Sequence, residues 1–352
     1  MKICFLANDL NSGAGGGRYT SELIDGVKKG GHHVVVLTET GDAPNSILRR
    51  GFGVFSSSFK ARQFLKDCDI IHALDGYPYA IIASLAGVRS HKKIVITAIG
   101  TYSVAPLYNR SSGLLLKFAY KRADKIIAIS NYTKNEILKK VNLKNIEVIN
   151  PGIDFNKLYA PRMVTGGKFI LSVGALKHRK GYHISIPAFA EAKKTIPDLT
   201  YKIVGDQSNI GYFRHLQELA KKFNIENDIQ FIQKISDEEL RRLYQKASLF
   251  VLASVNEGHH FEGFGLVFCE AAAAGLPVVG TRGNGIEDAV RDGYNGILVP
   301  QNDIQGTVDA IISILSDSTK FAKMSHESYE WAKQHDLSGV IPKYLDVYEA
   351  LL

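Results

Sequence analysis

The sequence predicts an α/β protein built from two doubly wound parallel sheets, and three observations support this. The chain has 352 residues, more than the roughly 100–200 of one ordinary domain. Short apolar runs recur through both halves, with helical patterns between several of them. Between the halves, residues 150–168 (NPGIDFNKLYAPRMVTGGK) contain proline and glycine and lack any hydrophobic period, which is typical of a linker.

Six runs in the first half are expected to form strands, because nearly continuous apolar segments are typical of parallel strands buried on both faces. They are KICFLA (2–7), HVVVLT (33–38), DIIHAL (69–74), KIVITA (93–98), KIIAIS (125–130) and IEVIN (146–150). SELIDGVKKGG predicts a helix with Leu23, Ile24 and Val27 on one face, ended by Gly30 and Gly31.

The second half repeats this plan, so a second sheet of the same kind is expected. Its strands are FILSVGAL (169–176), TYKIVG (200–205), IQFI (229–232), SLFVLAS (248–254), PVVGT (277–281) and GILVP (296–300). In SDEELRRLYQKAS, Ser236 and Glu239 form a predicted capping box, with Leu240, Leu243 and Tyr244 on one face. Paired domains of this kind bind ligands at the carboxyl ends of their strands, in the cleft between them.

Composition indicates a soluble globular protein of the cytoplasm. Apolar residues make up 45% and charged residues 22%, and no apolar run reaches the ~18 residues of a membrane helix. The short apolar start, MKICFLANDL, does not resemble a secretory signal. Three widely spaced cysteines suggest neither disulfides nor a zinc cluster.

The positive charge lies in the first half. Residues 1–155 hold 21 Lys and Arg against 12 Asp and Glu, whereas the rest of the chain is nearly balanced. This asymmetry fits an anionic partner, whether nucleic acid, a membrane surface or a phosphorylated substrate, and it equally fits a solubilising surface. The interleaved basic and aromatic residues of single-strand nucleic-acid platforms are absent, so no nucleic-acid partner is expected.

A glycine-rich loop, NSGAGGGRYT (11–20), follows the first strand. It fails the G-x-G-x-x-G fingerprint because Arg18 or Thr20 stands where the third glycine belongs, which counts against a nicotinamide enzyme. Gly15 and Gly16 still stand between a strand and a helix, where bare backbone N–H groups can approach a phosphate. The alternative is a flexible turn.

The stretch EGHHFEGFGLVFCEA (257–271) allows a metal site, an acid/base pair or a sugar-nucleotide clamp. Elsewhere Asp67 and Asp69 spell D-x-D, but the end of a helix and the start of a strand explain them, so no metal site is expected. The chain has neither a G-x-S-x-G nucleophile elbow nor an H-E-x-x-H zinc helix.

Several segments together carry a family resemblance. IAISNYTKNEI, VINPGID, LSVGALKHRKGYHISIPAFAEA, YKIVGD, FEGFGLVFCEAAAAGLPVVGT and GNGIEDAVRDGYNGILVP occur in this order. They resemble the retaining glycosyltransferases of the GT-B fold, the large glycosyltransferase family 4 (glycosyl transferases group 1). The most specific element is E-x7-E, met by Glu262 and Glu270 with GFGL between them. The resemblance covers nearly the whole chain and implies two Rossmann-like domains that face a central cleft.

The resemblance implies a nucleotide-diphosphate sugar as donor, UDP- or GDP-linked, and no cofactor. Glu270 would accept hydrogen bonds from the ribose hydroxyls, and Glu262 would contact the transferred sugar. The backbone N–H groups of Phe264, Gly265 and Leu266 would open a helix toward the sugar or the diphosphate.

The family's phosphate grip corresponds to Arg179 and Lys180, although Ala175 stands at its usual arginine position. Their charges would stabilise the leaving diphosphate more strongly in the transition state than in the ground state. A second departure is Ile99, which replaces a histidine of many relatives, so that the histidine's contribution is either missing or supplied by another residue such as Tyr102. Retaining members are thought to transfer on one face, with the donor's phosphate taking the acceptor proton, and a metal-independent reaction is expected.

The resemblance implies an acceptor-binding domain over residues 1–160, a donor-binding domain over 161–330, and a final helix within 331–352 that crosses back to the first domain. Residues 110–122 (RSSGLLLKFAYKR) mix apolar and basic side chains, which suits an anionic membrane surface at the inner face and a glycan or lipid-linked acceptor of polysaccharide biosynthesis. Packing as a core helix is the alternative. The rival functions are a sugar-nucleotide epimerase of the same fold and a catalytically silent nucleotide-sugar binding module.

Overall fold

The computed structural model describes residues 1–10, 15–40, 45–159 and 168–352, which divide into two compact units. The N-terminal unit comprises Met1–Gly152 and Leu337–Leu352, and the C-terminal unit comprises Ile153–Asp336. Each unit contains a six-stranded sheet with parallel pairing, which confirms the predicted α/β class. The boundary predicted between residues 160 and 161 lies outside the described residues.

The sheet of the N-terminal unit has the order β2-β1-β3-β4-β5-β6. Its strands are β1 (Lys2–Ala7), β2 (His33–Thr38), β3 (Ile70–Leu74), β4 (Lys93–Ala98), β5 (Lys125–Ala128) and β6 (Ile146–Val148). In β1, Ile3 pairs with Val34 on one side and Ile70 on the other, and the strand is buried from Ile3 to Ala7. Burial on both faces is the reason this strand reads as a continuous apolar run.

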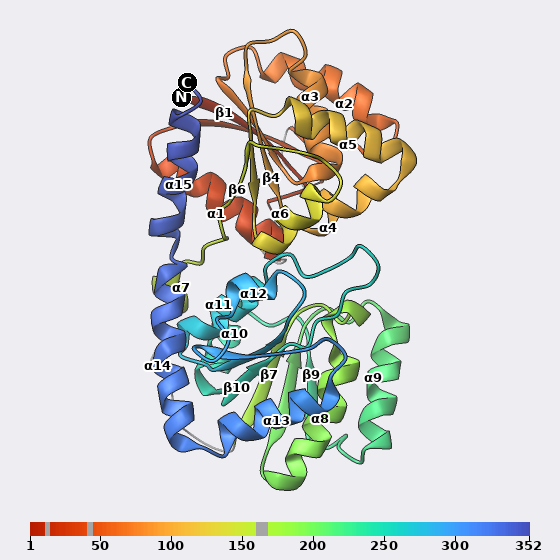
Figure 1. The fold of residues 1–352 in the computed structure, drawn as a ribbon, viewed down its shortest axis with the longest axis vertical. Coiled ribbons are helices and arrows are strands. Elements are labelled where there is room, and N and C mark those ends of the chain that lie inside the picture. The colour runs from red at the N-terminus through yellow and green to blue at the C-terminus, as the bar shows by residue number, and fades with distance from the viewer. Residues whose placement is uncertain (11–14, 41–44, 160–167) are drawn as a thin grey trace. The chain divides into compact units, whose positions relative to one another are not determined.

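Helices cover both faces of this sheet, with α1 and α15 on one side and α2, α3 and α5 on the other (Figure 1). The helical elements are α1 (Gly15–Lys29), α2 (Gly53–Ala61), η1 (Arg62–Phe64), η2 (Gly76–Ala80), α3 (Ile81–Ala86), α4 (Thr101–Val104), η3 (Ala105–Tyr108), α5 (Arg110–Arg122), α6 (Asn131–Leu138) and α15 (Leu337–Glu349). Leu23, Ile24 and Val27 of α1 are buried, as the sequence predicted.

The last helix, α15, packs against the N-terminal unit through a buried aromatic network. The hydroxyls of Tyr19 and Tyr344 share a hydrogen bond, and Nδ1 of His72 lies 2.7 Å from the Tyr348 hydroxyl. The other ring nitrogen of His72 lies 2.8 Å from the Thr97 hydroxyl. Burial lowers the pKa of His72 to about 3, so the imidazole is neutral at physiological pH. These polar contacts fix α15 on the sheet although the chain leaves this unit at Gly152.

The sheet of the C-terminal unit has the order β12-β11-β10-β7-β8-β9. Its strands are β7 (Phe169–Val173), β8 (Thr200–Val204), β9 (Ile229–Ile232), β10 (Leu249–Val251), β11 (Val278–Thr281) and β12 (Gly296–Val299). The helical elements are α7 (Phe155–Leu158), η4 (His178–Lys180), α8 (Tyr182–Thr195), α9 (Ile210–Lys222), α10 (Asp237–Lys246), α11 (Leu266–Ala273), α12 (Ile286–Ala289), α13 (Ile304–Leu315) and α14 (Ser318–Gln334).

The capping box predicted in this unit is confirmed. Ser236 and Glu239 form the capping box of α10, with the serine hydroxyl accepting from the Glu239 N–H and the glutamate accepting from the Ser236 N–H. Tyr244 of the same helix is buried. Over the residues that the structure describes, no helix has both the length and the apolar character that crossing a membrane requires.

Candidate functional site

The two candidate cations lie on a tight turn after β7. Arg179 and Lys180 end the short helix η4, and Gly181 follows with φ of 70°, a left-handed conformation that favours glycine. A Cβ atom at Gly181 would lie 1.7 Å from the carbonyl oxygen of Ala253, just beyond β10. The absence of a side chain therefore lets this turn approach the end of the neighbouring strand and fixes where both cations start.

Arg179 and Lys180 converge on one carboxylate. Lys180 Nζ lies 2.6 Å and Arg179 Nη1 lies 3.0 Å from Oε2 of Glu262. The side chains of Lys180 and Glu262 are each 12% exposed, and that of Arg179 is 28% exposed. Lysine has three N–H donors and arginine five, so Glu262 occupies only part of the donor capacity of this pair.

The charge state of Glu262 follows from opposing effects. Burial raises the pKa of this carboxyl, but the charges of Lys180 and Arg179 and the hydrogen bonds from both outweigh burial, so that the pKa lies below its ordinary value. Glu262 is therefore ionised at neutral pH and can only accept hydrogen bonds. An ionised acceptor beside two cations suits a ligand that carries both hydroxyl donors and anionic oxygens.

The backbone after Glu262 turns directly into helix α11. Gly265 precedes the helix with φ of 87° and ψ of 59°, and a Cβ atom there would lie 2.9 Å from the Phe268 ring. Phe264 is buried and its ring lies 5.9 Å from that of His335. This packing fixes the N-terminus of α11, where Leu266 is the first residue and where backbone N–H groups favour negative charge.

Glu270 lies on α11 and is 5% exposed. Its Oε2 accepts a hydrogen bond of 3.0 Å from the Tyr244 hydroxyl of α10. The two glutamates of E-x7-E therefore have different surroundings. Glu262 is held by cations, whereas Glu270 accepts a hydrogen bond from a neutral phenol.

Residues 257–260, at the start of EGHHFEGFGLVFCEA, contact the turn that carries the cations. Glu257 and His260 pair through two backbone hydrogen bonds of 2.9 and 3.0 Å, which fold residues 257–260 into a small hairpin. Oε1 of Glu257 lies 2.5 Å from Nδ1 of His178, the residue before Arg179. The His178 ring stacks on His183 with a centroid separation of 4.0 Å. This hairpin is therefore tied to the turn that carries the cations.

Gly15 and Gly16 belong to the N-terminal unit, unlike the other candidate site residues. Helix α1 begins at Gly15, directly after the loop that contains residues 11–14, which lie outside the described residues. Within the described part of the chain, a Cβ atom at Gly16 would meet no neighbouring atom within 4 Å. The helix therefore begins earlier than the predicted segment SELIDGVKKGG, and Gly15 and Gly16 lie in its first turn rather than between the strand and the helix.

The sequence analysis missed a polar cluster at the carboxyl edge of the N-terminal sheet. Asp75 follows β3 with φ of 118° and accepts hydrogen bonds from the Gly76 N–H (2.7 Å) and the Ser103 hydroxyl (2.5 Å). Glu39, after β2, accepts from Arg50 Nε (2.7 and 2.9 Å) and from the Tyr79 hydroxyl. Burial raises the pKa of Asp75 to about 6. The sequence could have indicated this cluster through the positions of both carboxylates, because each directly follows a predicted strand.

Ile99, which stands at the position of the family's histidine, has a backbone role in this cluster. Its N–H is among the donors that lower the pKa of Asp75 against the effect of burial. Tyr102 is 51% exposed, and the Arg50 guanidinium lies 5.1 Å from its ring centroid. Position 99 therefore supports a carboxylate through its main chain, and an exposed aromatic ring lies nearby.

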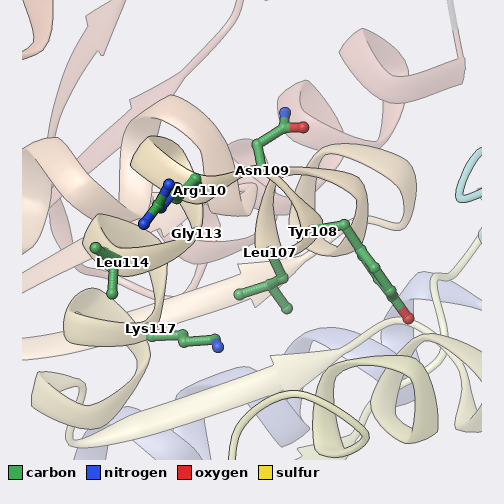
Figure 2. Close-up of a pocket in the computed structure, with 7 residues that line it drawn as sticks. All are labelled: Leu107, Tyr108, Asn109, Arg110, Gly113, Leu114 and Lys117. Atoms are coloured by element: carbon green, nitrogen blue, oxygen red, sulfur yellow. The ribbon is translucent and has the colours of Figure 1, made fainter.

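A pocket of about 400 Å³ lies elsewhere on the N-terminal unit, between η3 and α5 (Figure 2). Its lining combines apolar side chains with two cations, and comprises Leu107, Tyr108, Asn109, Arg110, Gly113, Leu114 and Lys117. Leu116 and Tyr120 of α5 are buried, whereas Leu114 is 70% and Phe118 is 44% exposed. The predicted alternative, a core helix, thus describes one face of 110–122, and the other face exposes apolar side chains.

Asp67 and Asp69 have structural partners. The Lys2 backbone N–H donates to Asp69 Oδ2 at 2.7 Å, and Lys2 Nζ lies 3.8 Å from Asp67 Oδ2. Within the described ranges, no three His, Cys, Asp or Glu side chains gather as ligands of one metal ion.

Family models match both halves of the chain. Residues 160–331 match the model described as glycosyl transferases group 1, and residues 13–157 match the model described as glycosyltransferase family 4. Together the two matched regions contain every residue of the candidate site.

Among curated proteins, a glycogen synthase of Mycobacterium tuberculosis is 31% identical over 258 residues, covering 71% of this chain and 60% of that protein. A D-inositol 3-phosphate glycosyltransferase of Corynebacterium urealyticum is 32% identical over 223 residues, covering 58% of this chain and 51% of that protein. The chain thus spans between half and two thirds of the length of these relatives.

Solved structures match nearly the whole length of this chain. A glycosyltransferase from Rickettsia africae has a TM-score of 0.83 at 20% identity and covers 99% of this chain and 98% of its own. The Anabaena protein HepE, solved with UDP-glucose, has a TM-score of 0.83 at 21% identity and covers 99% and 100%. This likeness shows the GT-B fold. Together with the two family models, it shows that the chain belongs to glycosyltransferase family 4.

Proposed function

We propose that this protein is a retaining glycosyltransferase that moves a hexose from a nucleotide-diphosphate sugar to a hydroxyl of a glycan or lipid-linked acceptor. The observation that carries the proposal is the convergence of Lys180 and Arg179 on Glu262, beside the N-terminus of α11. Two cations, an ionised acceptor and free helix N–H groups match the oxyanions and hydroxyls of such a donor. The named activities and UDP complexes of the relatives support this choice of substrate.

In the proposed reaction, the bond between the sugar's anomeric carbon and the diphosphate oxygen breaks while the acceptor oxygen bonds to the same face of that carbon. The acceptor's proton passes to an oxygen of the leaving diphosphate. Lys180 and Arg179 stabilise the negative charge that grows on the diphosphate, and the backbone N–H groups of Phe264, Gly265 and Leu266 supplement them. These side chains supply the positive charge for which other transferases use a metal ion.

The glutamates divide the donor between them in this proposal. Glu270, which already accepts from Tyr244, binds the ribose hydroxyls. Glu262, held between the cations, binds the hydroxyls of the transferred sugar. Gly15 and Gly16, at the start of α1, would offer backbone N–H groups to a phosphate.

The N-terminal unit binds the acceptor. Its net positive charge and the exposed apolar face of residues 110–122 support contact with an anionic membrane at the cytoplasmic face, where a lipid-linked acceptor would be presented. The pocket lined by Arg110, Leu114 and Lys117 adds cations beside apolar surface at the same place.

Thermal denaturation in the presence of UDP- and GDP-linked hexoses tests the donor. One nucleotide sugar and its nucleoside diphosphate should raise Tm, and the free hexose should not. The anomeric configuration of a product formed with that donor then tests retention. Unchanged Tm with every nucleotide sugar contradicts the proposal, and epimerisation of the donor without acceptor would favour the epimerase instead.

A further inference from the structure

Helix α2 (Gly53–Ala61) buries small side chains and exposes its phenylalanines. Its buried residues are Val54, Ser57, Ser58 and Ala61. The phenylalanines of this segment face outward instead, with Phe52 95%, Phe55 55% and Phe59 76% exposed. Residues 52, 55 and 59 follow the i, i+3, i+7 spacing of one helical face, so the three rings form a single stripe.

The buried serines show that the orientation of α2 is specified by its own contacts. The Ser58 hydroxyl donates to the Val54 carbonyl at 2.7 Å, and the Ser57 hydroxyl donates to the Ile47 carbonyl at 3.2 Å. Small, satisfied side chains on this face allow α2 to pack against α3. Contiguous apolar rings turned to water mark an interaction surface, because burying an aromatic side chain is strongly favourable.

The charge around this stripe identifies the partner. Residues 49–66 contain five cations and no acidic residue, namely Arg49, Arg50, Lys60, Arg62 and Lys66. Arg50 pairs with Glu39 and Arg62 donates to the Leu85 carbonyl, whereas Lys60 and Lys66 are exposed. Aromatic rings flanked by lysines suit the boundary between lipid headgroups and acyl chains, with phosphates beside the lysines.

A second exposed apolar face lies on α5, on the same side of the sheet. Helix α3 packs against both α2 and α5, and the three helices lie on one side of the sheet (Figure 1). Helix α5 adds the exposed side chains of Leu114 and Phe118 with Lys117 between them. Residues 110–122 also lack acidic side chains.

We propose that the phenylalanine stripe of α2 (Phe52, Phe55 and Phe59) inserts into the interface of an anionic lipid bilayer, with α5 as an accessory contact. This inference extends the membrane contact proposed above for residues 110–122, and it assigns the principal insertion to a different helix. The occupant is the lipid surface itself, since cations without acids favour an anionic surface over a typical mixed-charge protein surface.

Co-sedimentation with vesicles of equal parts phosphatidylcholine and phosphatidylglycerol at low ionic strength tests this proposal. Wild type should bind these vesicles and should bind phosphatidylcholine vesicles at least ten-fold more weakly. The variant Phe52→Ser/Phe55→Ser/Phe59→Ser should lose at least ten-fold in partitioning, since all three side chains are exposed and the fold should persist. Leu114→Ser/Phe118→Ser should lose less, and Lys60→Glu/Lys66→Glu should weaken binding to the anionic vesicles.

The matched control is Ile210→Ser/Phe223→Ser, which removes exposed apolar side chains from α9 and its C-cap in the other unit. This control should bind vesicles like wild type. A Phe55→Trp variant should be quenched by brominated acyl chains, above the background of Trp331, the only native tryptophan.

Three outcomes overturn the inference. They are no binding by wild type, unchanged binding by the triple serine variant, and a wild-type dimer that the serine substitutions dissolve, which would make the stripe a contact between copies. Donor-induced Tm shifts on the same variants separate this inference from the proposed function. A variant that binds the donor but not vesicles leaves the transferase proposal intact, and vesicle binding without any donor response contradicts only the transferase.

Discussion

The two sheets have the same parallel construction, yet their carboxyl edges carry different electrostatics. After β7 of the C-terminal unit, two cations hold Glu262 ionised and lower its pKa. After β3 of the N-terminal unit, Asp75 is half-buried and accepts from hydroxyl and backbone donors, and desolvation raises its pKa to about 6. The fold therefore places loops at the carboxyl edge of each sheet. The residues on those loops determine whether a carboxyl group there is held ionised or has a raised pKa.

The C-terminal edge depends on the close backbone approach at Gly181, so breaking that approach should have the largest effect. Gly181→Ala puts a Cβ atom 1.7 Å from the Ala253 carbonyl and forces a left-handed alanine. We expect destabilisation of about 4 kcal/mol or more, measured as a fall in Tm together with loss of turnover.

Gly258→Ala is the matched control, because φ at Gly258 is 60° and no atom lies within 4 Å of the added Cβ. It should show only the left-handed strain of about 1–2 kcal/mol. Equal losses in the two variants would contradict the role assigned to the close approach at Gly181.

Removing one cation tests whether the positive charge at the C-terminal edge supports the reaction. Lys180→Ala should reduce kcat by a factor of about 10²–10³, the usual effect of deleting one donor to a developing oxyanion. Arg179→Ala should have a smaller effect, since its side chain is more exposed. Turnover at saturating donor is the measurement, and Lys177→Ala, an exposed neighbour, is the control. A Lys180→Ala variant with wild-type kcat would remove this lysine from the reaction.

Asp75 should give the N-terminal edge a pH signature. Its pKa is raised from 3.8 to about 6, so the folded state holds the proton more tightly than the unfolded state. The resulting stabilisation is present below pH 4 and is lost as pH rises to about 6. Two pKa units correspond to about 3 kcal/mol at most.

The Asp75→Asn variant should not show the loss of stability that wild type shows as pH rises from 4 to 6. The difference in unfolding free energy between wild type and Asp75→Asn should change between pH 4 and pH 6 and stay flat above pH 7. A difference that does not vary with pH would show that Asp75 titrates normally, and the contrast between the two edges would then fail.

Much of the fold could be predicted from the sequence because strands buried on both faces carry a strong local pattern. The runs at 2–7, 33–38, 93–98 and 229–232 coincide with β1, β2, β4 and β9. Other strands were predicted to extend further than they do in the structure. SLFVLAS was expected to be strand throughout, but β10 is Leu249–Val251, because the chain beyond it forms loop backbone that packs against the turn at Gly181.

The missed features depend on contacts between distant residues. The pair of His178 and Glu257 joins positions 79 residues apart, and neither residue type indicates the other. Periodicity groups Phe55 and Phe59 of α2 on one face but does not tell which face meets the sheet. Burial of Ser57 and Ser58 resolves this only once α3 is in place.

Equilibrium binding of a nucleoside diphosphate and of the matching nucleotide sugar, to wild type, Glu270→Ala and Glu262→Ala, tests the central claim most directly. Glu270→Ala should weaken the binding of both ligands by roughly ten- to a hundred-fold, as expected for hydrogen bonds to a charged group. Glu262→Ala should leave the nucleoside diphosphate nearly unchanged and weaken the nucleotide sugar or its turnover. Equal losses of both ligands in both variants, or no binding by wild type, would contradict the account.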